Sequence, residues 1–150
     1  MVLCYRDEYA KALGDARGDF KVLLPQEWLL TALTETTPRT GSQGEYFLFG
    51  HCTEKTALPA SNADWGKIFS YLGAVLKPVA LGCCGMAGTY GHDAAHLQDS
   101  RDIYQQSWGP ALARLPKERC LVSGYSCRSQ VKRMEGEPLR HPLQALLELL

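Results

Sequence analysis

The spacing of apolar residues along this chain predicts several amphipathic helices. The clearest covers residues 62–76, where apolar side chains recur at intervals of three and four residues, as the buried face of a helix requires. Shorter helices are expected at residues 5–13, after Pro25, through residues 104–108, at residues 126–134 and after Pro142. Pro25 and Pro142 suit a first helical turn, because an N–H group at that position would have no intrahelical partner.

Short apolar runs between these helices predict strands at residues 46–49, 79–81 and 120–123. Residues 21–24 predict a further brief extended segment, and residues 34–44, rich in Thr, Pro, Gly and Ser, predict a loop. Short strands that alternate with amphipathic helices are typical of an α/β fold. We therefore expect a small parallel sheet flanked by helices.

Length and composition place the chain among soluble globular proteins. Its 150 residues suit one domain over 1–150, and 45% hydrophobic with 21% charged residues is an ordinary globular composition. Sixteen basic residues balance sixteen acidic ones, so no net field attracts nucleic acid. The longest apolar stretch, 72–81, is interrupted by Lys77 and Pro78 and is shorter than the roughly 20 residues of a membrane span. We expect neither nucleic-acid binding nor a transmembrane segment.

The amino terminus has acidic residues where a signal peptide would be basic and then apolar, which predicts a cytoplasmic location. In that reducing compartment, six cysteines are expected to be thiols or metal ligands instead of disulfides. Cys4 is expected to be a small core residue. Cys120 lies inside a predicted strand, so we expect a core residue there too, with a ligand as the alternative.

Four cysteines follow the ends of three different predicted strands: Cys52, the adjacent pair Cys83 and Cys84, and Cys127. Ligands of open α/β sheets bind where parallel strands end, so these thiols are expected to meet at one edge. Four thiolates suffice for one iron–sulfur cluster, and soft sulfur ligands also suit zinc. The sequence therefore predicts a metal site formed by these four cysteines.

A glycine-rich segment at residues 82–91 surrounds the adjacent cysteine pair. Gly82, Gly85 and Gly88 would let the backbone approach a bound group, so that N–H groups reach its sulfur atoms. His51 and His92 are possible additional ligands or partners of a substrate carboxylate. Surface or helix-capping roles are expected for His96 and His141.

The spacing Cys52, Cys83-Cys84-Gly85 and then a distal cysteine resembles the cysteine-rich CCG domain. That domain occurs in heterodisulfide reductase and in the iron–sulfur component of glycolate oxidase. The strings GCCGMAGTYGH, GYSCRSQVKR and LRHPLQALL resemble still more closely the carboxy-terminal region of bacterial FAD-linked oxidases that carry iron–sulfur regions. The likeness covers nearly all 150 residues and implies that Met1 is an artificial or truncated start.

This resemblance implies an electron-transfer domain of an FAD-dependent 2-hydroxyacid dehydrogenase, acting on a D-2-hydroxyglutarate-, lactate- or glycolate-like acid. Its implied cofactor is a 4Fe-4S cluster, with FAD held in another part of the parent protein. The implied partners are the FAD-binding and ferredoxin-like regions and, indirectly, a quinone or other electron acceptor. The implied location is the cytoplasm, with peripheral attachment at the inner membrane as an alternative. Tyr90, His92 and Arg128 are the expected substrate neighbours.

The chain departs from the family pattern at one point. The family ends in Cys-x-x-Cys, whereas Gly124 stands here three residues before Cys127. Four ligands favour a single cubane or a structural zinc over a noncubane double cluster. A zinc-stabilised docking module without redox activity is therefore the alternative reading. The chain also has no P-loop, dinucleotide fingerprint or nucleophile elbow, so we do not expect it to turn over a substrate alone.

Overall fold

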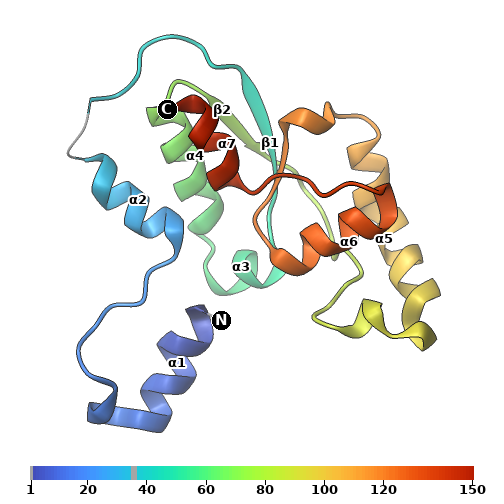
Figure 1. The fold of residues 1–150 in the computed structure, drawn as a ribbon, viewed down its shortest axis with the longest axis horizontal. Helices are drawn as coiled ribbons and strands as arrows, with labels where there is room; N and C mark the ends of the chain where they lie inside the picture. The colour runs from blue at the N-terminus through green and yellow to red at the C-terminus, as the bar shows by residue number, and fades with distance from the viewer. Residues whose placement is uncertain (1, 35–36) are drawn as a thin grey trace. The chain divides into compact units, whose positions relative to one another are not determined.

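The computed structural model describes residues 2–34 and 37–150 and forms two compact units, Met1–Thr37 and Pro38–Leu150 (Figure 1). The first unit contains the helices α1 (Val2–Leu13) and α2 (Pro25–Leu33), with the 3₁₀ turn η1 (Gly14–Arg17) after α1. The helices expected at residues 5–13 and after Pro25 are thus confirmed. Residues 21–24, expected to be extended, lie outside any helix or strand, and Leu24 has an extended backbone. One domain over the whole chain stays a prediction.

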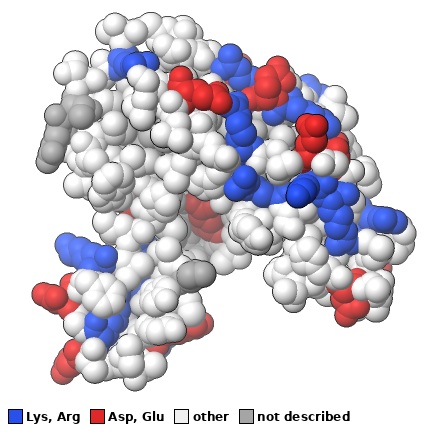
Figure 2. Space-filling model, in the orientation of Figure 1, with Lys and Arg blue, Asp and Glu red and all other residues white. Residues whose placement is uncertain are grey.

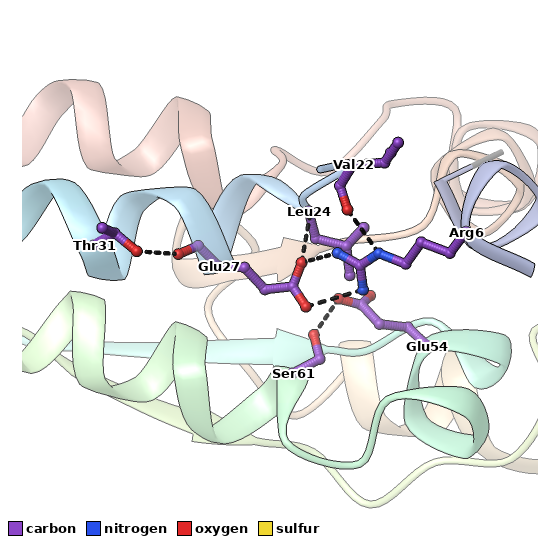
Figure 3. Close-up of polar contacts among 7 residues, drawn as sticks. All are labelled: Arg6, Val22, Leu24, Glu27, Thr31, Glu54 and Ser61. Atoms are coloured by element: carbon purple, nitrogen blue, oxygen red, sulfur yellow. Dashed lines mark hydrogen bonds and ion pairs between the residues drawn. The ribbon is translucent and has the colours of Figure 1, made fainter. Parts of the chain in front are cut away.

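An ion pair connects the two helices of the first unit (Figure 3). The Arg6 guanidinium binds the Glu27 carboxylate, and its Nε donates to the Val22 carbonyl at 2.7 Å. Glu27 also accepts the Leu24 N–H at 2.7 Å, which satisfies a free donor at the start of α2. The side-chain hydrogen bond from Arg6 lowers the pKa of Glu27. This cluster of polar contacts therefore joins α1 to the beginning of α2.

The second unit is built on a three-stranded parallel sheet in the order β2-β1-β3. The central strand β1 (Glu45–Phe49) pairs with β2 (Val75–Pro78) on one side and β3 (Cys120–Val122) on the other. Five α-helices and three 3₁₀ turns complete it: α3 (Cys52–Ala57), α4 (Ser61–Tyr71), η2 (Tyr90–His92), η3 (Ala94–His96), α5 (Leu97–Leu112), η4 (Lys117–Arg119), α6 (Tyr125–Glu135) and α7 (Pro142–Leu149). The expected α/β fold, a small parallel sheet flanked by helices, is confirmed.

Helices cover both faces of this sheet, with α4 and α7 on one side and α5 and α6 on the other (Figure 1). Successive strand residues point to opposite faces, so Tyr46 packs edge-on against Phe69 of α4 while Phe49 packs against Trp108 of α5. The α5 and α6 side forms a continuous buried cluster that includes both Cys84 and Cys127. Two of the four candidate thiols, Cys84 and Cys127, thus belong to the core on this side of the sheet.

The expected boundary between the long helix and the second strand was wrong. The helix ends at Tyr71 instead of residue 76, and the strand occupies Val75–Pro78 instead of 79–81. Gly73 turns the chain with a φ of +80°, and a Cβ there would lie 2.4 Å from the Gly41 carbonyl oxygen. Because β2 is an edge strand, Lys77 can pair with Glu45 at its rim and Pro78 can end it without breaking the sheet.

The helix expected through residues 104–108 is longer than predicted, since α5 runs from Leu97 to Leu112 with Pro110 inside it. Most other boundaries agree with the sequence. The strands expected at 46–49 and 120–123 and the helices expected at 126–134 and after Pro142 are present within a residue or two of their predicted bounds. The 34–44 loop has no helix or strand at its described residues, and residues 35–36 lie outside the described part. No helix within the described residues is long and apolar enough to cross a bilayer.

The basic residues of α6 hold neighbouring segments. Figure 2 shows Lys and Arg side chains gathered over the region of α6, with acidic side chains beside them. Arg128 donates to the Leu139 carbonyl at 3.0 Å and to Gln144 at 3.3 Å. Arg133 donates to the Gly91 carbonyl. Helix α6 is therefore fastened on one side to the chain that enters α7 and on the other to the glycine-rich loop.

Candidate metal centre

The three parallel strands deliver four cysteines to the same edge of the sheet. Cys52 begins α3 three residues after β1, and Cys127 lies in the first turn of α6 after β3. Cys83 and Cys84 lie in the loop that follows β2. This is the carboxyl edge, where open α/β sheets bind ligands.

Two of the four thiols are in direct contact. The Sγ atoms of Cys84 and Cys127 lie 3.4 Å apart, and both side chains are buried. Cys83 is half-buried, and its sulfur accepts the Gly85 N–H at 3.3 Å. Cys52 is exposed. The site thus has a buried floor of two thiols and a more open side at Cys52 and Cys83.

The electrostatics of the four thiols are linked. Hydrogen bonding from the Cys127 thiol lowers the pKa of Cys84, and the Met86 N–H and the Cys83 thiol act in the same direction. The pKa of Cys127 is raised, first by its hydrogen bond with Cys84, then by burial and by the charges of Cys84 and Cys52. Cys84 is therefore the thiol of this pair that ionises first. A thiolate is the form that binds a metal.

The donor set fits a thiolate-bound metal chemically. Two thiolates on one tetrahedral zinc, with Zn–S bonds of about 2.3 Å, lie about 3.8 Å apart. The Cys84–Cys127 separation of 3.4 Å is close to that spacing. Within residues 2–34 and 37–150, however, no three His, Cys, Asp or Glu side chains have the spacing that a metal ion requires. The fold thus brings one thiol pair together and leaves Cys52 and Cys83 beside it.

The two remaining cysteines lie elsewhere. Cys120 is fully buried at the beginning of β3, where its thiol donates to the Pro116 carbonyl at 3.3 Å. Burial raises its pKa to about 11. Cys120 is therefore a core thiol, as we expected. Cys4 is only half-buried and donates to Glu8, so the expectation of a core residue was wrong there. Cys4 lies in α1, which offers no enclosed core position, since none of its described residues is buried.

Of the predicted histidines, only His51 lies beside the thiols. It is the residue before the first turn of α3, directly before Cys52, its ring nitrogen is 3.4 Å from the Ser126 hydroxyl, and burial lowers its pKa. A Cβ on Gly124 would lie 2.3 Å from this ring, so the ring packs against the backbone that leads to Cys127. The imidazole therefore leaves no room for a side chain at Gly124, three residues before Cys127.

The other predicted site residues are turned toward structural partners or solvent. His92 is exposed, and the exposed Tyr90 stacks on His96 at 4.0 Å and donates to Asp99 at 3.0 Å. Arg128 is engaged by the α7 segment, as described above. His141 caps α7 by accepting the Leu143 N–H at 3.2 Å, which confirms its capping role.

The predicted glycines differ in what they do. Gly82 accepts the Trp108 indole N–H at 3.1 Å, and Gly88 has open space around it. Gly85 has a φ of +86°, and a Cβ there would lie 2.2 Å from the Ser100 carbonyl oxygen. Only glycine fits this position, which directly follows Cys84. The Gly85 N–H donates to the Cys83 sulfur at 3.3 Å, and contacts from this loop to the sulfur atoms of a bound group stay a prediction.

Sequence reasoning missed a polar chain beneath the open side of the site. The His51 N–H donates to the Ser123 hydroxyl at 3.1 Å, and that hydroxyl donates to Glu54 at 2.7 Å. Ser61 donates to the same carboxylate (Figure 3). This chain links the segment after β1 to the segment after β3. Sequence reasoning also missed Ser100 and Gln130. Their signal in the sequence was a polar residue on the buried face of a helix, α5 and α6 respectively.

Comparison with known proteins gives relatives along the entire chain. The chain is 57% identical over 150 residues, all of it, to D-2-hydroxyglutarate dehydrogenase of Escherichia coli. It is 58% identical over 149 residues to the protein of that name in Pantoea ananatis, and 46% identical over 158 aligned positions to that of Haemophilus influenzae. The chain spans only about 15% of the length of these relatives. No protein-family model and no solved structure matches it.

Proposed function

We propose that this chain is the carboxy-terminal, iron–sulfur electron-transfer part of an FAD-dependent 2-hydroxyacid dehydrogenase, with D-2-hydroxyglutarate as the substrate of the whole enzyme. In this proposal FAD and the oxidation of the hydroxy acid belong to other regions of the parent protein. The chain receives electrons from those regions, with a ferredoxin-like region as its neighbour and a quinone or similar acceptor at the end of the path. It is a part of an oxidoreductase and does not turn over substrate alone.

One observation carries this proposal: the buried contact between Cys84 and Cys127, with Cys83 and Cys52 at the same edge of the sheet. Relatives 46–58% identical over essentially the whole chain, each named D-2-hydroxyglutarate dehydrogenase, support the substrate. Such identity makes the same fold and the same site the natural expectation for those proteins. The contact joins a loop residue to a residue of α6, and it lies at the edge of the sheet to which the other two cysteines also belong.

An iron–sulfur cluster bound here would supply one-electron transfer at a potential tuned by its protein surroundings. Cys84 and Cys127 would hold it from the core side, where Phe49, Met86 and Trp108 exclude water. The Gly85 N–H already donates to the Cys83 sulfur and would stabilise negative charge on it. Cys52, exposed at the start of α3, leaves one side of the site open to an electron-transfer partner.

The test is elemental analysis with a visible spectrum on protein purified without oxygen. We expect about four irons with matching sulfide per chain and a brown iron–thiolate absorbance. Cys84→Ser should remove the bound iron, because its thiol lies at the centre of the set. Cys4→Ser is the matched control, since Cys4 lies in the other compact unit, and should retain the iron. Full retention of iron by Cys84→Ser would refute the site.

A zinc-stabilised docking module is the second candidate. The Cys84–Cys127 separation of 3.4 Å favours it, because this value is close to the spacing of two thiolates on a single ion. Zinc is colourless and has no redox chemistry. About one zinc per chain, without iron or visible absorbance, would replace the electron-transfer proposal by this one.

A further inference from the structure

The glycine-rich loop after Cys84 closes around a single serine of α5. A Cβ on Gly85 would lie 2.2 Å from the Ser100 carbonyl oxygen, and a Cβ on Gly91 would lie 2.6 Å from the Ser100 hydroxyl. The Gly91 N–H donates to the Met86 carbonyl at 2.9 Å, which closes the loop. Ser100 itself is fully buried. The path of the loop, and with it the place of Cys84, therefore depends on Ser100.

Helix α6 contacts this loop and its serine at three points spaced three residues apart. The Cys127 sulfur lies 3.4 Å from that of Cys84, and Gln130 Nε2 lies 2.9 Å from the Ser100 hydroxyl. One turn further on, Arg133 donates to the Gly91 carbonyl. Residues spaced by three lie on one face of a helix, so the same face carries the ligand thiol and two groups that fix the loop.

The Gln130 amide is held by its nitrogen alone. Its Nε2 also donates to the Ser100 carbonyl at 3.2 Å, and because a carbonyl can only accept, this contact fixes which end of the amide points toward α5. The buried Oε1 has no hydrogen-bond partner within the described part of the chain. An unpaired buried acceptor is unfavourable, so an apolar residue would serve packing better. The glutamine is therefore useful here for its NH₂ group, which donates to Ser100.

We infer that Gln130 is a positioning residue of the thiol site: it holds Ser100, Ser100 holds Gly85, and the loop thereby keeps the Cys84 sulfur against that of Cys127. Gln130 Nε2 would lie 3.1 Å from a Cβ on Gly85, so the amide also lies beside the residue that follows Cys84. The inference deepens the proposed function where it concerns metal binding. The arrangement of the two thiols that it explains exists without metal.

The test compares Gln130→Met, which keeps the size of the side chain and removes the NH₂ group, with wild type. In the metal-free chain, we expect Cys84 to react with an alkylating reagent about tenfold faster, as seen by peptide mass spectrometry. In the chain reconstituted with iron and sulfide, we expect metal affinity to fall about 10–100-fold, the usual cost of losing an outer-shell partner. Gln106→Met on the exposed side of α5 is the matched control and should change neither value.

The alkylation rate of Cys120 shows whether Gln130→Met moves the Cys84 loop alone or loosens the whole fold. Cys120 is as deeply buried as Cys84 but begins β3, and its thiol donates to the Pro116 carbonyl and not to the glycine-rich loop, so its alkylation rate should stay at the wild-type value in Gln130→Met. Equal acceleration at Cys120 would overturn the inference, and so would unchanged Cys84 reactivity. If wild type binds no metal, the proposed function fails while the Cys84 rate still decides this inference.

A second variant covers the case in which Gln130→Met does not fold. Ser100→Ala removes only the hydroxyl that Gln130 contacts and leaves the carbonyl contact in place. We expect a smaller acceleration at Cys84 in the same direction, again with no change at Cys120. A folded Ser100→Ala protein with wild-type Cys84 reactivity would overturn the inference.

Discussion

The two ends of the sheet contain buried cysteines in opposite circumstances. At the carboxyl edge, Cys127 lies against Cys84, with Cys83 nearby and a glycine-rich loop around them. At the amino end of β3, Cys120 is just as buried, but within the described residues its thiol makes only the hydrogen bond to the Pro116 carbonyl. The comparison teaches that burial does not distinguish a structural thiol from a ligand, whereas the presence of other thiols around it does.

The largest expected effect is a difference in metal content between variants of Cys127 and Cys120. Cys127→Ala should abolish metal binding, because it removes one of only four thiols at the site. Cys120→Ala should keep the full metal content and lose only about 1 kcal/mol of unfolding free energy, the usual cost of deleting a small buried group. Metal per chain and urea unfolding measure the two effects. Loss of metal in Cys120→Ala would erase the distinction between the two ends.

The next largest effect is a loss of stability that tests how the glycine-rich loop packs at the carboxyl edge. Gly85→Ala should destabilise the chain by more than about 2 kcal/mol, because a left-handed backbone costs alanine about 1–2 kcal/mol and its Cβ would also meet the Ser100 carbonyl. Gly88 also has a positive φ, +71°, but a Cβ there would meet open space, so Gly88→Ala should lower the free energy of unfolding by only about 1 kcal/mol. Chemical denaturation of both variants gives the difference. Equal losses would mean that the loop does not close on Ser100.

At the other end, a polar cluster stabilises the fold without forming a thiol site. Glu135 accepts from the buried Tyr104 hydroxyl at 3.0 Å and pairs with Lys117 at 2.9 Å, and the Lys117 contact lowers its pKa. Glu135→Gln should cost about 1 kcal/mol, discounted because the pair is partly exposed to solvent. Metal content should not change. A fall in metal content would show that the two ends are coupled.

The smallest effect is a pH dependence that arises near the carboxyl edge. Burial, followed by the charge of Arg128, lowers the pKa of His141, so the folded chain favours the neutral ring that caps α7. Stability from this group is present above the ordinary histidine pKa of about 6.5 and is lost as the pH falls below it. Urea unfolding at about pH 8 and about pH 5 should show the loss in wild type. His141→Asn, which keeps a capping side chain, should reduce it.

Local patterns were enough to predict much of the fold. Two strands, the helices opened by Pro25 and Pro142, and the α/β class followed from apolar spacing and proline placement, because these signals act within a few residues. The boundary near residue 75 did not, because the period of the apolar residues continues past Tyr71 while the pairing of Val75 with Glu45 takes that segment into the sheet. A contact between distant segments outweighed a local pattern.

The sequence by itself determined that four cysteines would follow three strands and that glycine would follow Cys84, since chain order and residue type are local facts. Only the tertiary structure decided which thiols touch, because the Cys84–Cys127 contact joins residues 43 positions apart. It also assigned Cys120 to the core and gave Gln130 its contact with Ser100. Side-chain distances between separate elements depend on how α5 and α6 pack on the sheet, and no local pattern encodes that packing.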